Sequence, residues 1–76
     1  MTIGERVEVI LMFSEGYMNW EIAERTNWPI RDIRETVSKA CGYDEHLYLK
    51  HSGTYGQDKT PMSRQLAERI VRRIWG

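Results

Sequence analysis

Residues 16–40, with the sequence GYMNWEIAERTNWPIRDIRETVSKA, have the pattern of two short helices joined by a tight turn. Ile22 and Ala23 lie at apolar positions of the first helix. Ile33 and Val37, four residues apart, lie at apolar positions of the second. Because Ala23 is small, the two helices can approach closely, whereas a larger side chain would overpack the contact at a cost of about 1–3 kcal/mol.

A proline separates the two helical patterns. Pro29 has no N–H, disfavours the helical conformation of Trp28, and suits the first turn of a following helix. The sequence therefore predicts helices over residues 19–26 and about 29–41, with Asn19 capping the first and Trp28 filling the inside of the turn. A connection of about three to four residues between two such helices is typical of a helix-turn-helix.

A further helix precedes this unit. Thr2 and Glu5 have the spacing of a capping box, in which each side chain accepts the backbone N–H of the other residue. Gly16 suits the left-handed position just beyond a helix end. We therefore predict a helix over residues 3–14, with a core-facing side that comprises Ile3, Val7, Ile10, Leu11 and Ser14 and is widened by Met12 and Phe13.

Residues 43–60 leave two alternatives open after Gly42, which we expect to end the preceding helix. Either Asp44 caps one more helical turn that leads into a loop, or residues 47–49 form a strand of a short wing between the third helix and the last. Two glycines and a weak alternation of apolar residues favour the helical turn and loop.

The C-terminal part of the chain predicts a last helix. Thr60 followed by Pro61 has the favoured order of a cap residue and a first-turn proline. The apolar stripe that follows comprises Met62, Leu66, Ala67, Ile70, Val71 and Ile74. The fold class is therefore all-α, a helix-turn-helix core of three helices plus a C-terminal amphipathic helix, as a single domain over residues 1–76.

Composition limits the classes of protein to which this chain can belong. It has 76 residues, with 11 basic and 11 acidic side chains and one cysteine, Cys41. A single cysteine excludes an internal disulfide and a cysteine-based zinc site, and no apolar run reaches the length of a membrane span. With no signal peptide in view, we expect a soluble cytoplasmic protein without a cofactor or a membrane partner.

Charge is unevenly distributed although the formal net charge is zero. Residues 1–29 hold five acidic and two basic side chains, whereas residues 61–76 hold four arginines and one glutamate. The chain is therefore acidic in its first part and basic in its last.

The stretch from Gly16 onward resembles the helix-turn-helix of LuxR-type regulators and related bacterial and phage modules, which read roughly Gly-x-Ser-Asn-x-Glu-Ile-Ala-x-x-Leu-x-Ile-Ser-x-x-Thr-Val. The residues in register are Gly16, Asn19, Glu21, Ile22, Ala23 and Ile33. The resemblance covers about a third of the chain, and it implies a small transcription regulator that binds DNA through the second helix of the motif.

Four residues depart from that pattern. Met18 replaces the usual capping serine, and Trp20 replaces a lysine that in such modules often approaches phosphate. Pro29 replaces a serine that caps the second helix, and Asp32 stands where a threonine often meets DNA. These departures affect the expected contacts with DNA and leave the predicted fold unchanged.

A recognition helix over residues 29–41 would place outward side chains in the major groove of double-stranded DNA. These residues are Ile30, Arg31, Arg34, Glu35 and Ser38. Phosphate contacts are expected from Arg25, Lys39 and the C-terminal arginines Arg64, Arg69, Arg72 and Arg73. The alternative is an ordinary solvated helix face with ion pairs such as Arg31 with Glu35.

A protein partner is the alternative to DNA. The chain has three tryptophans and four tyrosines, and aromatic residues with arginine are enriched in protein interfaces, although a small core also gains area from large side chains. Trp20 and the C-terminal arginines would then contact RNA polymerase or another transcription protein and inhibit transcription, as a phage-type module. The apolar stripe of the last helix suggests a homodimer as a further hypothesis.

The sequence gives little support for catalysis. His46 and His51 are five residues apart, with Cys41 nearby, and this spacing matches no helical pair of metal ligands. Two surface histidines explain the pattern better, and we expect no catalytic residue and no metal ligand.

Overall fold

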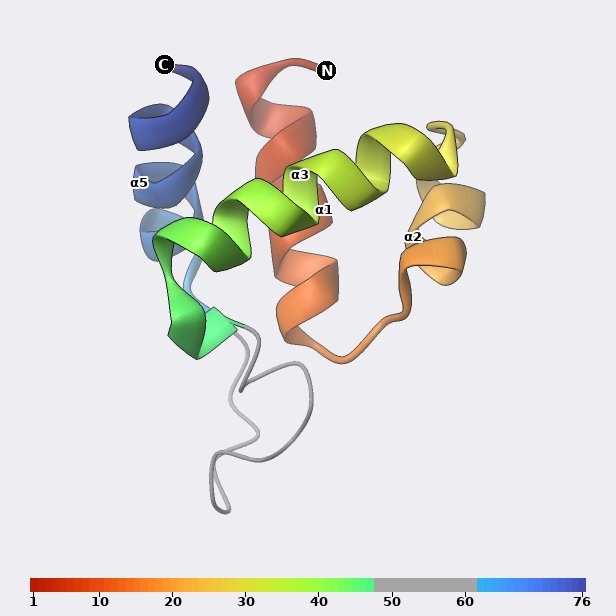
Figure 1. Ribbon diagram of the computed structural model, residues 1–76, viewed down its shortest axis with the longest axis horizontal. Coiled ribbons are helices and arrows are strands. Elements are labelled where there is room, and N and C mark those ends of the chain that lie inside the picture. Colours follow the sequence, from red (N-terminus) through yellow and green to blue (C-terminus); the bar gives the residue numbers. More distant parts are fainter. Residues whose placement is uncertain (48–61) are drawn as a thin grey trace.

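The computed structural model describes residues 1–47 and 62–76 (Figure 1). Its helices are α1 (Ile3–Ser14), α2 (Asn19–Thr26), α3 (Ile30–Tyr43) and α5 (Arg64–Trp75), and residues 45–47 are also helical. This part of the chain contains no strand, so the predicted all-α class is confirmed. Most of the predicted loop or wing, and the dipeptide at residues 60–61, lie outside the described residues.

Helix α1 is the centre of the arrangement. It lies beside α5, which runs in the opposite direction, and α3 crosses in front of both, with α2 at the far end of α3 (Figure 1). Both α1 and α3 contact the other three helices, whereas α2 and α5 do not touch each other. None of the described helices has the length and apolar character needed to cross a membrane.

The capping box predicted at the start of α1 is confirmed. The Thr2 N–H donates to Glu5 Oε1 over 2.7 Å, and the Glu5 N–H donates to Thr2 Oγ1 over 3.1 Å. The hydrogen bond from the Thr2 backbone lowers the pKa of the Glu5 carboxyl below its usual 4.5, because it favours the ionised form. Gly16, with φ at 104°, takes the left-handed position after the helix, as its type predicts.

The connection between α2 and α3 has the predicted helix-turn-helix length. Asn27 ends α2 in the left-handed region, with φ at 62°, and its N–H donates to the Ala23 carbonyl over 2.9 Å. Asparagine tolerates this conformation better than most residues, because its short polar side chain interacts with the local backbone. Pro29 then precedes α3 as its N-cap, and Trp28 packs half-buried against the core, as predicted.

Three predicted helix boundaries are wrong, which are the cap of α2, the end of α3 and the start of α5. Asn19 is the first residue of α2 and not its cap; Met18 is the cap, and the Glu21 carboxylate accepts the Met18 N–H over 2.8 Å. Helix α3 continues through Gly42 to Tyr43, because a glycine on an open side of a helix lowers its stability without ending it.

The last helix also begins later than predicted. It starts at Arg64 and not at Thr60-Pro61, because Met62 and Ser63 are not helical. The Ser63 hydroxyl accepts the Leu66 N–H over 3.2 Å, which makes Ser63 the cap. The predicted apolar stripe is otherwise present, with Ala67, Ile70 and Val71 buried.

The core covers α1 on more sides than one amphipathic stripe allows. Phe13 is buried together with Val7, Ile10 and Ser14, as predicted, and Val9 is buried in addition, whereas Ile3, Leu11 and Met12 are only half-buried. The predicted face of α1 was therefore misplaced in part, because α2, α3 and α5 all pack around this helix. The other buried apolar residues are Ile22, Ile33, Val37, Ala40, Leu47, Met62, Ala67, Ile70 and Val71.

Ser14 connects the end of α1 to the chain that leads into α5. Its hydroxyl donates to the Leu11 carbonyl over 2.7 Å and accepts the buried Met62 N–H over 3.3 Å. A buried backbone N–H needs such a partner, because water cannot reach it. The buried position of Ser14 in an otherwise apolar face is therefore explained by this contact.

Replacing Ser14 by alanine should lower the free energy of unfolding by about 1–2 kcal/mol, because the Met62 N–H would remain buried without an acceptor. In thermal denaturation followed by circular dichroism, this corresponds to a fall in Tm of about 4–8 °C per kcal/mol. The control is Ser38→Ala, an exposed serine of α3 that should change stability by less than about 0.5 kcal/mol. Equal effects of the two substitutions would contradict the role of Ser14.

Candidate functional site on α3

The outer face of α3 presents the residues that the sequence singled out for DNA. Burial of Ile33, Val37 and Ala40 against the core turns the opposite side of the helix to solvent. All six predicted residues of α3 are exposed, with Ile30 at 37%: Ile30, Arg31, Arg34, Glu35, Ser38 and Lys39. The structure therefore brings this part of the predicted set together on one surface.

Ion pairing on this face is partial. Lys39 Nζ lies 3.4 Å from Glu35 Oε1, so these two charges largely cancel. Arg31 and Arg34 form no ion pair with any described residue, so the Arg31–Glu35 pair of the solvated-face alternative is not formed. The two guanidinium groups near the start of α3 therefore face solvent without an ionic partner in residues 1–47 and 62–76.

Arg25 does not join this face. Its guanidinium carbon lies 4.6 Å from the centre of the Tyr17 ring, where a cation–π contact holds it. It also lines a shallow hollow together with Glu8 and Glu15 of α1. The structure thus places Arg25 beside acidic residues and apart from the other predicted DNA contacts.

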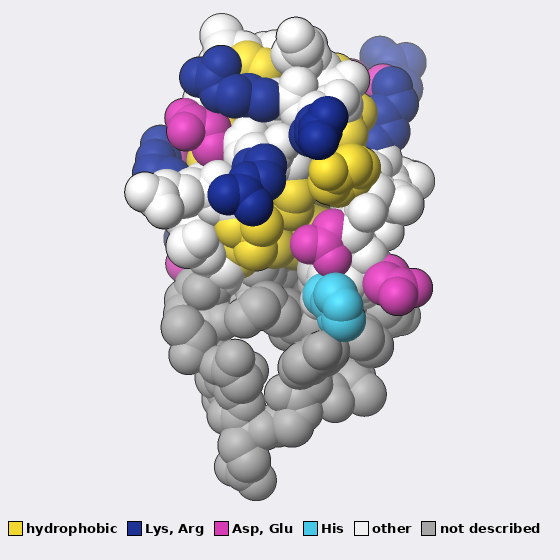
Figure 2. All heavy atoms as spheres, turned by 90° about the vertical axis from the view of Figure 1, so that its left-hand side faces the viewer, with side chains coloured by type: hydrophobic (Ala, Val, Ile, Leu, Met, Phe, Trp, Pro, Cys, Tyr) yellow, Lys and Arg dark blue, Asp and Glu magenta, His cyan; other side chains and the backbone are white. Residues whose placement is uncertain are grey.

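The arginines of α5 form a second basic area. Figure 2 shows Lys and Arg side chains gathered on the side of the molecule where α5 lies, with hydrophobic side chains between them. Arg64 is neutralised by Glu8, with Nη1 2.6 Å from Oε1, and Arg72 lies 4.0 Å from Glu68. Within the described residues, Arg69 and Arg73 have no acidic partner.

Arg6 holds α3 in place against α1 and α5, a role that the sequence analysis missed. Its guanidinium lies 4.2 Å from the centre of the Trp75 ring, and its Nη1 donates to Thr36 Oγ1 over 3.0 Å. Thr36 is fully buried and donates in turn to the Asp32 carbonyl over 2.9 Å. Lys39 Nζ lies 5.9 Å from the same ring, so two cations flank Trp75.

Removing this contact should loosen the docking of α3. Arg6→Ala loses a hydrogen bond from a charged group and a cation–π contact, and we expect the free energy of unfolding to fall by about 2 kcal/mol in urea denaturation. Arg6→Lys keeps the charge near Trp75 without the planar guanidinium, so its effect should be intermediate. Arg31→Ala is the matched control and should change stability by less than about 0.5 kcal/mol.

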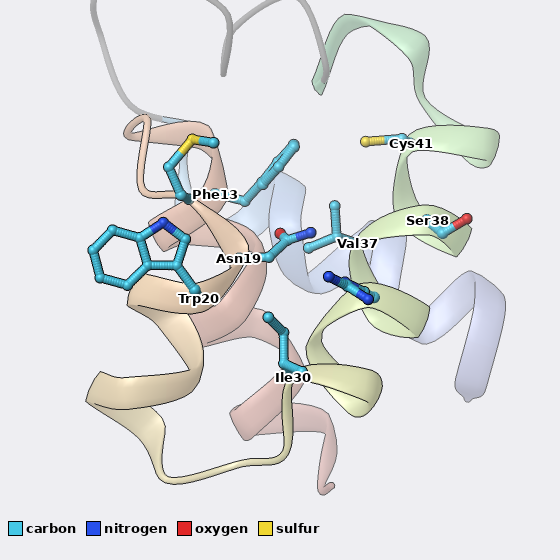
Figure 3. A pocket seen from close by; sticks show the side chains of 9 residues that line it. Phe13, Asn19, Trp20, Ile30, Val37, Ser38 and Cys41 are labelled. Atoms are coloured by element: carbon cyan, nitrogen blue, oxygen red, sulfur yellow. The ribbon is translucent and has the colours of Figure 1, made fainter.

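An apolar groove lies between the start of α2 and α3. It encloses about 580 Å³, and Phe13 and Val37, both almost fully buried, are among its lining residues. Trp20 and Met18 border it and are 55% and 51% exposed. Figure 3 shows Phe13, Asn19, Ile30, Val37 and Cys41 around the gap between the two helices, with Trp20 on the α2 side.

Two polar groups of this groove lack partners. The Oδ1 atom of Asn19 is buried and accepts no hydrogen bond from any described residue, which costs about 1–3 kcal/mol for such a group. Arg34 is the one charged side chain among the described residues that line the groove. The groove therefore combines an apolar surface with an unused acceptor and an unpaired cation.

Reactive chemistry finds little support among the described residues. Burial raises the pKa of the Cys41 thiol above its usual 9.0, and the nearby Asp44 carboxylate raises it further, so the thiolate nucleophile is disfavoured. In residues 1–47 and 62–76, no group of histidine, cysteine and carboxylate side chains is arranged to hold a metal ion. His46 is exposed, and His51 lies outside the described residues.

Comparisons with known proteins give no relative. No protein-family model matches the sequence, and no curated protein or solved structure matches it either. A function for this chain is therefore inferred from its own residues and their arrangement.

Proposed function

We propose that the protein binds double-stranded DNA through α3 and acts as a small transcription regulator. The observation that supports this most directly is the pair of unpaired arginines, Arg31 and Arg34, on the exposed face of the second helix of a helix-turn-helix arrangement. In such modules the second helix lies in the major groove, and its N-terminal residues contact the base edges.

Each exposed residue of this face has a chemical match in the major groove. Arg31 or Arg34 donates two hydrogen bonds to guanine O6 and N7, and Glu35 accepts from cytosine N4. Ser38 can contact either kind of base edge, and Ile30 suits the methyl group of thymine. Because Glu35 and Lys39 pair with each other in the unbound protein, use of Glu35 requires that this pair open.

Phosphate contacts in this proposal come from arginines without acidic partners. Arg69 and Arg73 of α5 meet this condition among the described residues, whereas Arg64 and Arg72 have carboxylate neighbours. Arg25 contributes less than the sequence suggested, because it stacks on Tyr17 next to acidic residues of α1. Because these positive charges are few, the affinity for DNA should fall as the salt concentration rises, but with only a modest slope of log K against log salt concentration.

The DNA proposal is tested with a site selected from random duplexes. Arg31→Ala and Arg34→Ala should each weaken binding to the selected site by about 5- to 150-fold and relax the base preference, because a bidentate contact to a base contributes about 1–3 kcal/mol. Arg69→Ala should weaken binding to all duplexes alike and reduce the salt slope by about one.

Arg25→Ala serves as the matched control in the same electrophoretic or anisotropy assay. It removes an exposed arginine that lies away from α3, and we expect a change in affinity of less than about threefold. Selection of no preferred duplex, or equal losses for Arg25→Ala and Arg34→Ala, would contradict DNA recognition by α3.

A second candidate function is favoured by the exposed apolar surface at the groove. Met18, Trp20 and Ile30 line the groove and are all exposed, so together they form an apolar surface that a protein partner would cover. In this alternative the same fold binds RNA polymerase or another transcription protein and inhibits transcription. A homodimer through α5 has less support, because α1 of the same chain covers most of the stripe and leaves only Leu66 and Ile74 half-buried.

A pull-down from bacterial lysate, with and without nuclease and at two salt concentrations, separates these candidates. The protein candidate predicts stoichiometric recovery of RNA polymerase subunits that resists nuclease and is lost in Trp20→Ala. Tyr43→Ala is the matched control, because Tyr43 is an aromatic residue with a similar exposure, 53%, that does not line the groove. Recovery of DNA alone, lost on nuclease treatment, would exclude this candidate.

A further inference from the structure

The groove between α2 and α3 has the size and the apolar lining to accept a side chain of a ligand. Its apolar lining includes side chains from three helices, Phe13 of α1, Trp20 of α2 and Ile30 of α3 (Figure 3). A volume of about 580 Å³ lies in the range of protein sites that hold the side chains of a ligand. An exposed apolar surface of this kind on a small domain is typical of a docking site.

The polar groups of the groove specify the chemistry of its occupant. Arg34 has no carboxylate partner among the described residues, so an occupant with a carboxylate would supply the missing charge. The Asn19 Oδ1 atom accepts no hydrogen bond from those residues, but it is already buried, so an occupant of the groove reaches it only if the Asn19 side chain shifts.

We propose that this groove docks a short acidic segment of a partner protein, which inserts a large apolar side chain beside Trp20 and pairs a neighbouring carboxylate with Arg34. Charge complementarity favours this occupant, because Arg34 would repel a basic segment. A phosphate backbone could pair with Arg34 but would gain nothing from the apolar surface of the groove. The inference rests on the protein-binding candidate and does not require that the chain bind DNA.

Docking in the groove would also compete with DNA. Ile30, Arg34 and Ser38 line the groove and belong to the face proposed for the major groove. A segment that covers Arg34 therefore removes a base contact, and the two ligands exclude each other. If the chain binds both, the partner acts as an antagonist of DNA binding.

The experiment is a selection of peptides from a random dodecapeptide library on the intact, nuclease-treated protein. We expect enriched peptides to carry aspartate or glutamate next to leucine, phenylalanine or tryptophan. The enriched peptide with the highest affinity is then titrated as a fluorescent conjugate. Trp20→Ala should weaken its binding at least tenfold, whereas Tyr43→Ala, the equally exposed control outside the groove, should change it less than twofold.

A charge reversal tests the role of Arg34 without removing a core residue. Selection on Arg34→Glu should enrich lysine or arginine in place of the acidic residues. Arg31→Glu is the matched control, because Arg31 is an exposed arginine of the same helix that does not line the groove, and its selected peptides should remain acidic. Circular dichroism of each variant establishes that it is folded before its peptides are compared.

Several outcomes would overturn the inference. These are no enrichment above an unrelated helical control protein, enrichment of basic peptides on the unaltered chain, or the same peptides on Arg34→Glu as on the unaltered chain. A dimer in sedimentation that Trp20→Ala dissolves would assign the groove to a second copy. Failure to recover RNA polymerase from lysate does not affect these results, because the library supplies the ligand, so failures of the candidate function and of the inference are distinguishable.

Discussion

The contact on which this small fold depends most is the one between Arg6 and its two partners. One guanidinium group stacks on Trp75 of α5 and donates to the buried hydroxyl of Thr36 in α3, so a side chain of α1 joins three helices at a single point. A chain of 76 residues buries a limited apolar core, and polar contacts that cross the core therefore contribute a larger share of its stability than in a larger domain. The Thr36 hydroxyl donates within α3 to the Asp32 carbonyl over 2.9 Å, and the Met1 sulfur lies 3.7 Å from it as a second, weaker acceptor.

The same contact fixes the orientation of the face that we assign to function. Because Thr36, Ile33 and Ala40 point into the core, the side chains on the opposite side of α3 point into solvent. Two kinds of surface adjoin on that outer face. The exposed charged residues of α3 lie next to the apolar groove between α3 and α2. A purely electrostatic surface would favour nucleic acid, and a purely apolar one would favour protein, so the combination is what motivates two candidate functions with shared residues.

The sequence predicted those features that depend on neighbouring residues. The capping box at Thr2, the left-handed glycine at Gly16 and the turn before Pro29 are local effects, and each is present. Competing local signals gave errors: Ser63 caps α5 in place of Thr60, and Gly42 does not end α3. The first error arises because Ser63 satisfies the same cap preference as Thr60, and the second because a glycine can remain within a helix without ending it.

Features that join distant parts of the chain were not predictable in the same way. Arg6 meets Trp75, and Ser14 meets Met62, only after the helices have packed. The burial of Thr36 could have been predicted, because Thr36 lies three residues after Ile33 and four before Ala40, on the same side of the helix. The candidate residues of α3 were all placed correctly on its exposed side, whereas the groove beside them required the relative position of α2.

The division of α3 into a buried side and an exposed side has an evolutionary consequence. The residues that hold the helix in place, such as Thr36 and Ile33, are different from the exposed residues that we propose to contact a ligand, such as Arg31 and Arg34. Substitutions on the outer side therefore alter recognition with little penalty in folding, and descendants of such a chain can acquire new targets while retaining one scaffold.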